Sequence, residues 1–506
     1  MTKSKKFIVN GAVTTLTALI LRLIGVSFNS YLSGRLGSEG MGIYTLIESV
    51  YLFALTFASS GIALGTTRLV SEANASGDVY SAHKSVRTAF VYALFFSLSS
   101  SVALFFLSPF IGIKLLCDAR TVLSLKVLAF SLPFVSLSSV LNGYFTAVRR
   151  PYKSSAAAVF ESFVNILIIV RLMVVFAAED LETACAAVAA GTVASEFLSL
   201  SLSYLLYRKD AKKIKGISTE NRSLMKKLVG ISLPLALSAY ARQGLVTVEH
   251  LLIPYGLKKH GLSSAEALSS YGLVHGMAFP VIMFPSCVVY SFASLTVPEM
   301  AEYRERGEKD KIDDLASKMI RYALLFSIGV AGIMTYYSYD LSLAVYSSPD
   351  TYRYIKIFAP LICVMYLDAS VDGMLKGLNE QLYSMKVNIA DALLSVLAVY
   401  FLTPHFGIFG YVLAVFICEI FNCALSLIRL VSVCRIRLDV LNDLILPVLF
   451  ALFSVSVSET LNSKIIPFAF SGAVGLVFRI VFSVFLYCAP LFIRKSAKAR
   501  KRKLTY

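Results

Sequence analysis

The sequence predicts an all-α, polytopic membrane protein with about 14 transmembrane helices, arranged as two parallel six-helix lobes and two C-terminal helices. Of its 506 residues, 57% are hydrophobic and only 16% are charged, whereas soluble domains carry roughly 25% charged residues. Long apolar segments follow one another along the whole chain, and two motifs recur at one fixed spacing. The composition predicts a membrane protein, and the fixed spacing of the motifs predicts an internal duplication of the chain.

The apolar segments have the length of membrane-spanning helices, since a span needs roughly 20 mostly apolar residues. They exceed the length of a barrel strand and lack sustained alternation, which favours helices over a β-barrel. The first segment follows MTKSKK, and we interpret it as an uncleaved span because Arg22 interrupts it and no small-x-small cleavage site follows. Fourteen segments qualify, at residues 7–35, 43–70, 86–113, 123–148, 153–177, 183–207, 228–255, 267–297, 316–340, 354–377, 382–403, 408–433, 440–460 and 467–493.

An internal repeat relates these spans. The segment GIALGTTRLVSEANASGD, which begins at Gly61, aligns without gaps on SFASLTVPEMAEYRERGE, which begins at Ser291. The same offset of 230 residues places Gly143 on Gly373. Two matches at one offset indicate a duplicated unit. Because six spans return the chain to the side on which it began, the copies are expected to be parallel repeats about an axis along the membrane normal.

The loops are short, and the longest separates the sixth span from the seventh. We therefore expect an N-terminal lobe of spans 1–6 (1–207), a basic cytoplasmic linker (208–227), a C-terminal lobe of spans 7–12 (228–435), and spans 13–14 with a basic cytoplasmic tail (436–506). No stretch between the spans is long enough for a catalytic domain, and the sequence contains neither GxxxxGK[ST] nor HExxH. We expect no enzyme, no catalytic residue, no bound metal and no cofactor.

The basic residues predict the orientation of the chain. Net charge is +17, and with the N-terminus in the cytoplasm 35 of the 48 Lys and Arg residues fall on the cytoplasmic side, against 8 on the other. By the positive-inside rule both termini are expected in the cytoplasm. Basic clusters beside membrane spans bind anionic membrane lipids, so we expect no nucleic-acid partner.

Ionisable residues inside the spans mark candidate functional positions, because each costs roughly 2.5 to 3.5 kcal/mol on insertion scales. Span 1 carries Arg22 with Thr15 and Asn29 at seven-residue steps, which places the three on one helical face. Span 7 repeats this arrangement with Ser238, Arg242 and Glu249. The candidate cavity residues are Arg22, Asn29, Glu48, Ser238, Arg242, Glu249, His275, Asp368 and Asp372. For other charged positions a pathway and plain helix packing both stay open: Glu161, Arg171, Glu196, Asp391, Glu419 and Arg479.

Helix breakers supply a second kind of candidate. Proline removes a backbone hydrogen bond and kinks a helix, and broken helices often border the binding sites of transporters. The gating or hinge candidates are Gly61, Gly65, Pro280, Pro285 and Pro298. Static kinks that only shape the helices are the alternative.

Several motifs together resemble a known family. RLIGVSFNSYLSGRLGSEGMGIYTL, SGIALGTTRLVSE, YGLVHGMAFPVIMFPSCVVYSFASLTVPEMAE, GMLKGLNEQ and LTPHFGIFGYVLAV occur in order between residues 7 and 430. They resemble the polysaccharide-biosynthesis, stage V sporulation protein B-like branch of the multidrug/oligosaccharidyl-lipid/polysaccharide (MOP) exporter superfamily, to which the lipid II flippase is related. The resemblance implies a MATE-like fold in the bacterial inner (plasma) membrane. It also implies flipping of a polyprenyl-diphosphate-linked glycan to the outer leaflet by alternating access, without ATP hydrolysis.

The resemblance also assigns roles to single residues. Arg22 and His275 stand where the lipid II flippase has cavity arginines in spans 1 and 8. Phe28 stands where it has a second arginine in span 1, so fewer cations face a diphosphate here. Glu249 stands where some relatives have a sodium-binding aspartate, but its expected partners align with Ser395 and Val399, so no sodium site is predicted.

Two other functions stay open. A cation- or proton-coupled multidrug antiporter of the same superfamily would use Glu249, Asp368 and Asp372 more than the arginines. A non-transporting membrane scaffold would tolerate loss of every cavity charge. The expected partners are the lipid-linked glycan and membrane lipids, with a proton or another ion as an open coupling partner. Since a two-lobed chain closes its own cleft, we expect a monomer.

Overall fold

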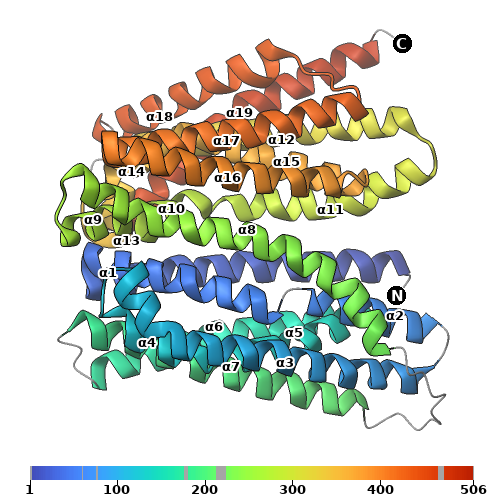
Figure 1. The fold of residues 1–506 in the computed structure, drawn as a ribbon. Coiled ribbons are helices and arrows are strands. Elements are labelled where there is room, and N and C mark those ends of the chain that lie inside the picture. The colour runs from blue at the N-terminus through green and yellow to red at the C-terminus, as the bar shows by residue number, and fades with distance from the viewer. Residues whose placement is uncertain are drawn as a thin grey trace. The chain divides into compact units, whose positions relative to one another are not determined.

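The computed structural model describes residues 3–59, 61–75, 78–175, 180–211, 224–464 and 472–504. Figure 1 shows the helices of these ranges as a ribbon. The described residues form α-helices and shorter helical turns and contain no strand. The all-α prediction is confirmed. The α-helices are α1 (Lys3–Ser59), α2 (Ile62–Ala75), α3 (Val79–Phe110), α4 (Thr121–Ala129), α5 (Leu132–Ala147), α6 (Pro151–Val175), α7 (Leu181–Ala211), α8 (Leu224–His260), α9 (Ser264–Tyr271), α10 (Phe279–Met283), α11 (Ser286–Glu305), α12 (Lys309–Tyr336), α13 (Ser338–Tyr346), α14 (Tyr352–Phe358), α15 (Ile362–Gly377), α16 (Gln381–Phe406), α17 (Ile408–Val433), α18 (Leu446–Lys464) and α19 (Gly472–Leu504).

Short π-helical turns or a 3₁₀ turn join several of these helices, at Ile111–Leu115, Gly272–Ala278, Ala359–Leu361 and Leu441–Ile445. Helix α1 contains one break, at Gly37, whose φ of 66° lies in the left-handed region that glycine adopts without strain. Most of the expected basic linker, residues 212–223, lies outside the described residues.

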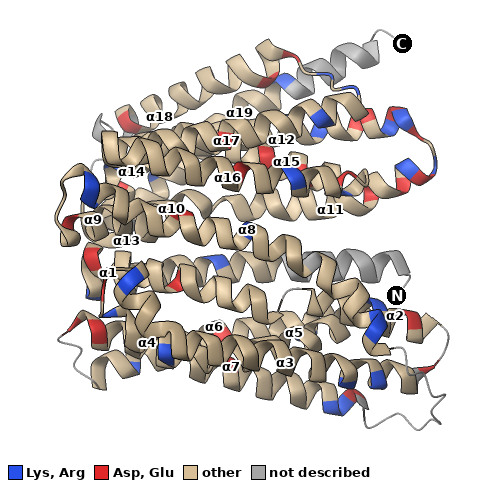
Figure 2. Cartoon of the chain, viewed as in Figure 1, with Lys and Arg blue, Asp and Glu red and all other residues tan. Residues whose placement is uncertain are grey.

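The helices have the length and composition of membrane spans. Within the described residues, 11 helices qualify singly, and the number rises to 13 if each of two bent pairs forms one span. The first of them, Leu16–Ala75, is 60 residues long and contains both the first and the second expected span. Figure 2 shows long stretches of helix without a charged residue. This is a multi-pass membrane protein, and the count of fourteen stays a prediction.

The chain forms two compact units. The first unit contains residues 1–28, 35–272 and 392–411, and the second contains residues 29–34, 273–391 and 412–506. In the first unit, α6 packs along α7, and α2 packs along α3 and α5. In the second unit, α15 packs along α11 and α12, and α18 packs along α19.

The repeat seen in the sequence is present in the helix boundaries. Helices α3 and α12 begin 230 residues apart, at Val79 and Lys309, and the same offset maps both ends of α5 onto both ends of α15. Even the unusual backbone conformations recur. Cys117 and Ser347 have φ of 53° and 54°, and Arg149 and Asn379 have φ of 57° and 63°. Since non-glycine residues rarely adopt positive φ, these matches confirm that the chain is duplicated.

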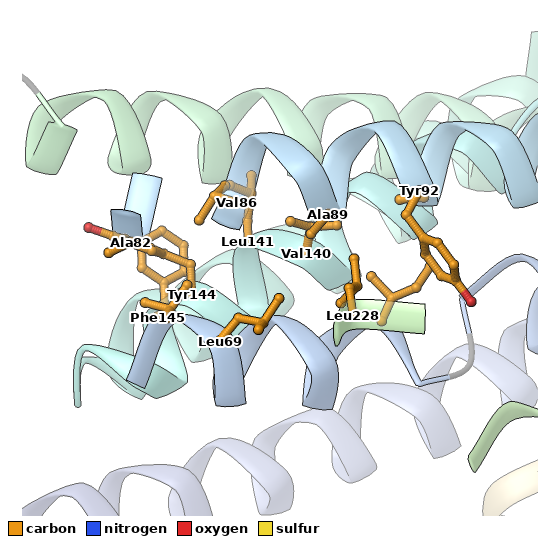
Figure 3. Packing of buried hydrophobic residues seen from close by; sticks show 13 residues of the cluster. Leu69, Ala82, Val86, Ala89, Tyr92, Val140, Leu141, Tyr144, Phe145 and Leu228 are labelled. Carbon is orange, nitrogen blue, oxygen red and sulfur yellow. The ribbon is translucent and has the colours of Figure 1, made fainter. Parts of the chain in front are cut away.

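The hydrophobic cores of the two units are also equivalent. In the first unit, α2, α3 and α5 meet around buried side chains that Figure 3 shows from close by. Its members include Val70, Ala82, Val86, Ala89, Leu141, Tyr144 and Phe145. The residues 230 positions later form a buried cluster of the second unit: Met300, Ile312, Ala316, Met319, Val371, Met374 and Leu375.

Helix α8 packs antiparallel to the second half of α1 and to α2, within the first unit. Three side chains of α8 donate hydrogen bonds to backbone carbonyl oxygens: Thr247 to Ser49 (3.2 Å), Tyr240 to Phe57 (3.1 Å) and Ser232 to Gly61 (3.0 Å). Gly61 has φ of 76° and separates α1 from α2. Its carbonyl oxygen accepts two hydrogen bonds, one from the Gly65 backbone N–H at 2.9 Å in the first turn of α2 and one from Ser232 of α8.

Equivalent glycines make equivalent close contacts, and this predicts their sensitivity to substitution. A Cβ on Gly143 would lie 2.5 Å from the Ala63 oxygen, and one on Gly373 would lie 2.8 Å from the Ala293 Cβ. We expect Gly143→Ala and Gly373→Ala each to destabilise the protein by about 1–3 kcal/mol, as overpacking does. Thermal unfolding of the detergent-purified variants measures this as a lower Tm.

The matched control is Gly230→Ala on α8, where an added Cβ would meet no atom within 4 Å. This variant should unfold at the wild-type temperature or slightly above it, because alanine is the better helix former. Wild-type melting of both Gly143→Ala and Gly373→Ala would contradict the close packing described here.

Candidate functional site

A buried tyrosine of the first unit lies within the electrostatic influence of two of the predicted carboxyl groups. Tyr271, the last residue of α9, is fully buried, and its hydroxyl lies 2.5 Å from His250 Nδ1 of α8. The charges of Glu249 on α8 and Glu48 on α1 both act on this hydroxyl. The four residues form what we call the Tyr271 cluster. The hydrogen-bonded hydroxyl and imidazole can exchange a proton, while the two carboxyl charges act on the hydroxyl.

Sequence reasoning found Glu48 and Glu249 but missed His250 and Tyr271. His250 follows Glu249 directly in an otherwise apolar stretch, so the cost of an ionisable group was a signal that pointed to it. No comparable signal marked Tyr271, because tyrosine is common in apolar segments. Its role depends on which helix it packs against.

Backbone contacts between glycines hold α9 in place. A Cβ on Gly272 would collide with the Ser38 oxygen and the Gly42 nitrogen, and one on Gly42 would collide with the Leu268 oxygen. Ser38 Oγ and Ser269 Oγ lie 2.7 Å apart beside these glycines. A capping box of Ser263 and Glu266 starts α9. The α1 backbone just beyond its Gly37 break is therefore in direct contact with α9.

An ionic contact supports the same part of α1 from another side. Arg120 Nη2 lies 2.7 Å from Asp118 Oδ2 and 2.7 Å from Glu39 Oε1. Hydrogen bonds to Asp118 and then to Glu39 raise the pKa of Arg120 above its ordinary value. The bridge joins the residues just after the Gly37 break to the turn that precedes α4.

The two predicted arginines lie on different helices of the first unit. Arg22 on α1 and Arg242 on α8 are both exposed, and Ser238 lies one turn before Arg242. The hydrogen bonds of Tyr240 and Thr247 to α1 carbonyls fix α8 on both sides of Arg242. Asn29 belongs to the second unit, and the side chain of Thr15 lies outside the described residues. That Arg22 and Arg242 act together stays a prediction.

The remaining candidates lie in the second unit. Asp372 pairs with Lys376 at 2.5 Å, and Asp368 accepts a hydrogen bond from Ser426 of α17. The other carboxyl oxygen of Asp368, Oδ1, is buried and has no hydrogen-bond partner within the described residues. His275 lies in the π-helical turn Gly272–Ala278 and stacks on Phe279, with ring centroids 5.1 Å apart.

Comparison with known proteins identifies the family. A family model described as "Polysaccharide biosynthesis protein" matches residues 7–261, half of the chain. The chain belongs to this polysaccharide biosynthesis protein family. Stage V sporulation protein B of Bacillus subtilis (strain 168) is 25% identical over 425 residues, which cover 81% of each protein. Sporulation protein YkvU of the same organism is 21% identical over 376 residues, covering 73% of this chain and 83% of that protein.

Solved structures confirm the fold of this polysaccharide biosynthesis protein. The lipid II flippase MurJ in an inward closed conformation matches with a TM-score of 0.72 at 11% identity, over 97% of this chain and 100% of that chain. An inward-facing MATE family transporter of the MOP superfamily matches with a TM-score of 0.66 at 14% identity, over 83% of this chain and 98% of that chain. The MATE-like fold class and the resemblance found in the sequence are both confirmed.

The helix breakers of this family member lie where helices change direction or pack closely. Gly61 separates α1 from α2, and a Cβ on Gly65 would collide with Ser232 and Leu228 of α8. Pro280 follows the π-helical turn, and Pro285 lies at a bend of 57° between Ser264–Met283 and Ser286–Glu305. Pro298 lies inside α11. Their role as hinges stays a prediction.

The contact between Ser38 and Ser269 can be tested by cross-linking. We expect the double variant Ser38→Cys/Ser269→Cys to form a disulfide on mild oxidation, because the two side-chain oxygens are already adjacent and cysteine is a close analogue of serine. The exposed native cysteines Cys117 and Cys488 are first replaced by serine. A cleavage site placed in the linker 208–227 then reports the bond as fragments that stay joined on a non-reducing gel.

The matched control replaces Ser232 of α8 instead of Ser269. Ser232 belongs to the same unit as Ser38 and donates to the Gly61 oxygen, about six helical turns beyond Ser38, so it should give separate fragments with Ser38→Cys. Separate fragments from Ser38→Cys/Ser269→Cys as well would show that α1 and α9 do not meet as described.

Proposed function

We propose that this protein is a flippase that moves a polyprenyl-diphosphate-linked glycan from the cytoplasmic to the outer leaflet by alternating access. The observation that carries the proposal is that two arginines, Arg22 and Arg242, both exposed, lie inside apolar helices of one unit. A guanidinium group in hydrocarbon is costly, so arginines in such helices mark a hydrated path or an anion site. A diphosphate headgroup supplies the anion, and arginine matches phosphate geometry better than lysine does.

Family membership supports this substrate class. The chain belongs to a family described by polysaccharide biosynthesis, and a protein of the same fold is a lipid II flippase. The resemblance found in the sequence implies a further arginine of that flippase at the position of Phe28, so we propose a glycan carrier that needs fewer cations. The lipid tail would stay in the bilayer while the headgroup passes between the helices.

The membrane potential favours export of such a substrate. With both termini in the cytoplasm of a bacterial cell and the cell interior negative, moving two negative charges outward gains about 2.3 kcal/mol per charge for each 100 mV. Glu48 and Glu249 would act as counter-charges for the arginines when no substrate is bound. They lie on α1 and α8, the helices that carry Arg22 and Arg242, and both charges act on the Tyr271 hydroxyl, which supports that role.

A flipping assay tests the role of the arginines. Purified protein is reconstituted in vesicles with a fluorescent polyprenyl-diphosphate disaccharide, and a membrane-impermeant quencher reports the label that reaches the far leaflet. We expect Arg22→Ala and Arg242→Ala each to slow flipping by about tenfold to a hundredfold, because a charge-assisted hydrogen bond to phosphate contributes about 1.5–3 kcal/mol.

The matched control is Arg171→Ala. Arg171 is also an exposed arginine of an apolar helix in the same unit, but it lies on α6, for which the family resemblance implies no cavity position. This variant should flip at the wild-type rate. Wild-type flipping by Arg22→Ala and Arg242→Ala would overturn the proposed diphosphate site. Efflux of an organic cation that depends on Glu249 but not on Arg22 would instead identify a multidrug antiporter.

The same assay tests alternating access. In the proposed orientation the contact between Ser38 and Ser269 lies at the outer ends of the first two spans and of spans 7 and 8. Oxidised Ser38→Cys/Ser269→Cys should therefore stop flipping, and reduction should restore it. A cross-linked protein that flips at the wild-type rate would show that this contact need not open.

A further inference from the structure

Two glutamates of the first unit, outside the proposed substrate site, hydrogen-bond directly to each other. Glu161 lies on α6 and Glu196 on α7, two helices that pack along one another. Their side chains share a hydrogen bond, and Ser199 Oγ donates a second one to Glu161 Oε2 at 2.7 Å. Both glutamate side chains are half-buried.

This geometry requires a proton. An ionised carboxylate only accepts hydrogen bonds, whereas a protonated carboxyl group also donates one. Two carboxyl groups that hydrogen-bond to each other therefore hold a proton between them, because two adjacent carboxylates repel and cannot both stay ionised in an apolar setting. Within the described part of the chain, neither glutamate forms an ion pair with a Lys, Arg or His that would replace this proton.

Among the described residues, the neighbouring helices bring no basic group into an ion pair with the two glutamates. From α1, the Tyr51 hydroxyl lies 2.7 Å from Ser131 Oγ, and the charges of Glu196, Glu161 and Glu48 all act on it. The titratable residue of α4 is Lys126, which lies over the ring of Phe105. That of α5 is Tyr144, on which the charges of Asp210 and Arg150 act. The surroundings therefore leave the proton as the means by which the pair is neutralised.

A separate acceptor lies beside the pair. Asn165 is one turn from Glu161 on α6, so the two side chains are neighbours on one helix face. Its side-chain oxygen Oδ1 is buried and has no hydrogen-bond partner within the described residues. A buried acceptor without a donor is costly. On this helix face Ser162, three residues before Asn165, and a protonated Glu161, four residues before it, are the groups that can donate to it.

The duplicated half shows how the same positions are neutralised without a shared proton. The offset of 230 residues places Glu161 on Asp391, Glu196 on Ser426 and Ser138 on Asp368. Each half thus has two carboxyl groups and one serine at three equivalent positions. In the second unit, however, Asp368 accepts from Ser426, and Asp391 accepts from Asn422 Nδ2 at 3.3 Å. Neutral donors bond to these carboxyl groups, whereas in the first unit two carboxyl groups face each other.

We propose that Glu161 and Glu196 form a proton-binding site of the first unit, occupied by one shared proton when α6 and α7 are packed as described. Release of the proton to water leaves two adjacent carboxylates, and their repulsion favours separation of the two side chains. Binding of the proton to this pair does not depend on the transported substrate. Only the use of this proton in transport rests on the proposed flippase function.

Infrared difference spectroscopy of the substrate-free protein tests the site. A protonated carboxyl group has a C=O stretching band that is distinct from that of a carboxylate and shifts in D₂O. At neutral pH we expect Glu161→Gln and Glu196→Gln each to lose the same band relative to wild type. The double variant should lose no more than either single one, because one proton is shared and a glutamine NH₂ group donates to the remaining carboxylate.

Two further variants make the result specific. Glu182→Gln removes a carboxyl group in the first turn of the same helix α7 and should leave the band unchanged. Ser199→Ala should keep the band but shift its frequency, since the serine donates to Glu161. Ser199→Ala also provides a readout if a glutamine variant fails to fold, which size-exclusion chromatography and circular dichroism reveal.

Three outcomes would overturn the proposal. One is an unchanged band in both single variants. Another is a double variant that loses twice the band of each single one, which indicates two independent protonated groups. The third is binding of radioactive sodium that the glutamine variants abolish, with no protonated band in wild type. Because no glycan lipid is present, the result stands whether or not the flipping assay succeeds.

Discussion

An ionisable side chain inside an apolar helix needs water, a partner or a proton, and the polar contacts of this protein follow from that need. Arg479 of α19 lies 3.3 Å from Asp340 and over the ring of Tyr337. The arginine and the aspartate neutralise each other, whereas either charge alone in an apolar setting would be costly. Asp372 is neutralised within its own helix by Lys376. Glu161 and Glu196 form no ion pair with a basic residue in the described part of the chain, and the proposed shared proton takes the place of such a partner.

Duplication kept the backbone and changed the side chains. Helix boundaries, left-handed residues and core positions recur at one offset in the two units. The polar positions outside these cores do not recur in kind, since Glu196 corresponds to Ser426 and Ser138 to Asp368. A packed core tolerates only side chains of suitable volume. A polar position tolerates different side chains, provided that each donor and acceptor finds a hydrogen-bond partner. The two halves can therefore share a fold and carry different chemistry.

The proposed substrate site depends on helix α8, which lies beside helices far from it in the sequence. Three of its side chains bond to carbonyl oxygens of the first spans, and Arg242 and Glu249 lie on this same helix. The Tyr271 cluster is completed by α9, whose approach to α1 is close enough for backbone atoms to touch only because Gly42 and Gly272 have no side chain. Substitutions at these glycines are therefore expected to disturb the site without altering any charged residue.

The sequence alone determined the membrane fold, the doubling and the positions of the costly charges. These properties can be read along the chain. The length of an apolar segment, the offset between two motifs and a charged residue within an apolar segment are all visible without knowing which helices pack together. Only the tertiary structure decided which polar side chains contact each other. His250 meets Tyr271, Glu161 meets Glu196 and Ser38 meets Ser269 because particular faces of helices are in contact. One sequence has no signal for such pairings, since the energy of a hydrogen bond depends on distance and direction in space rather than on separation along the chain.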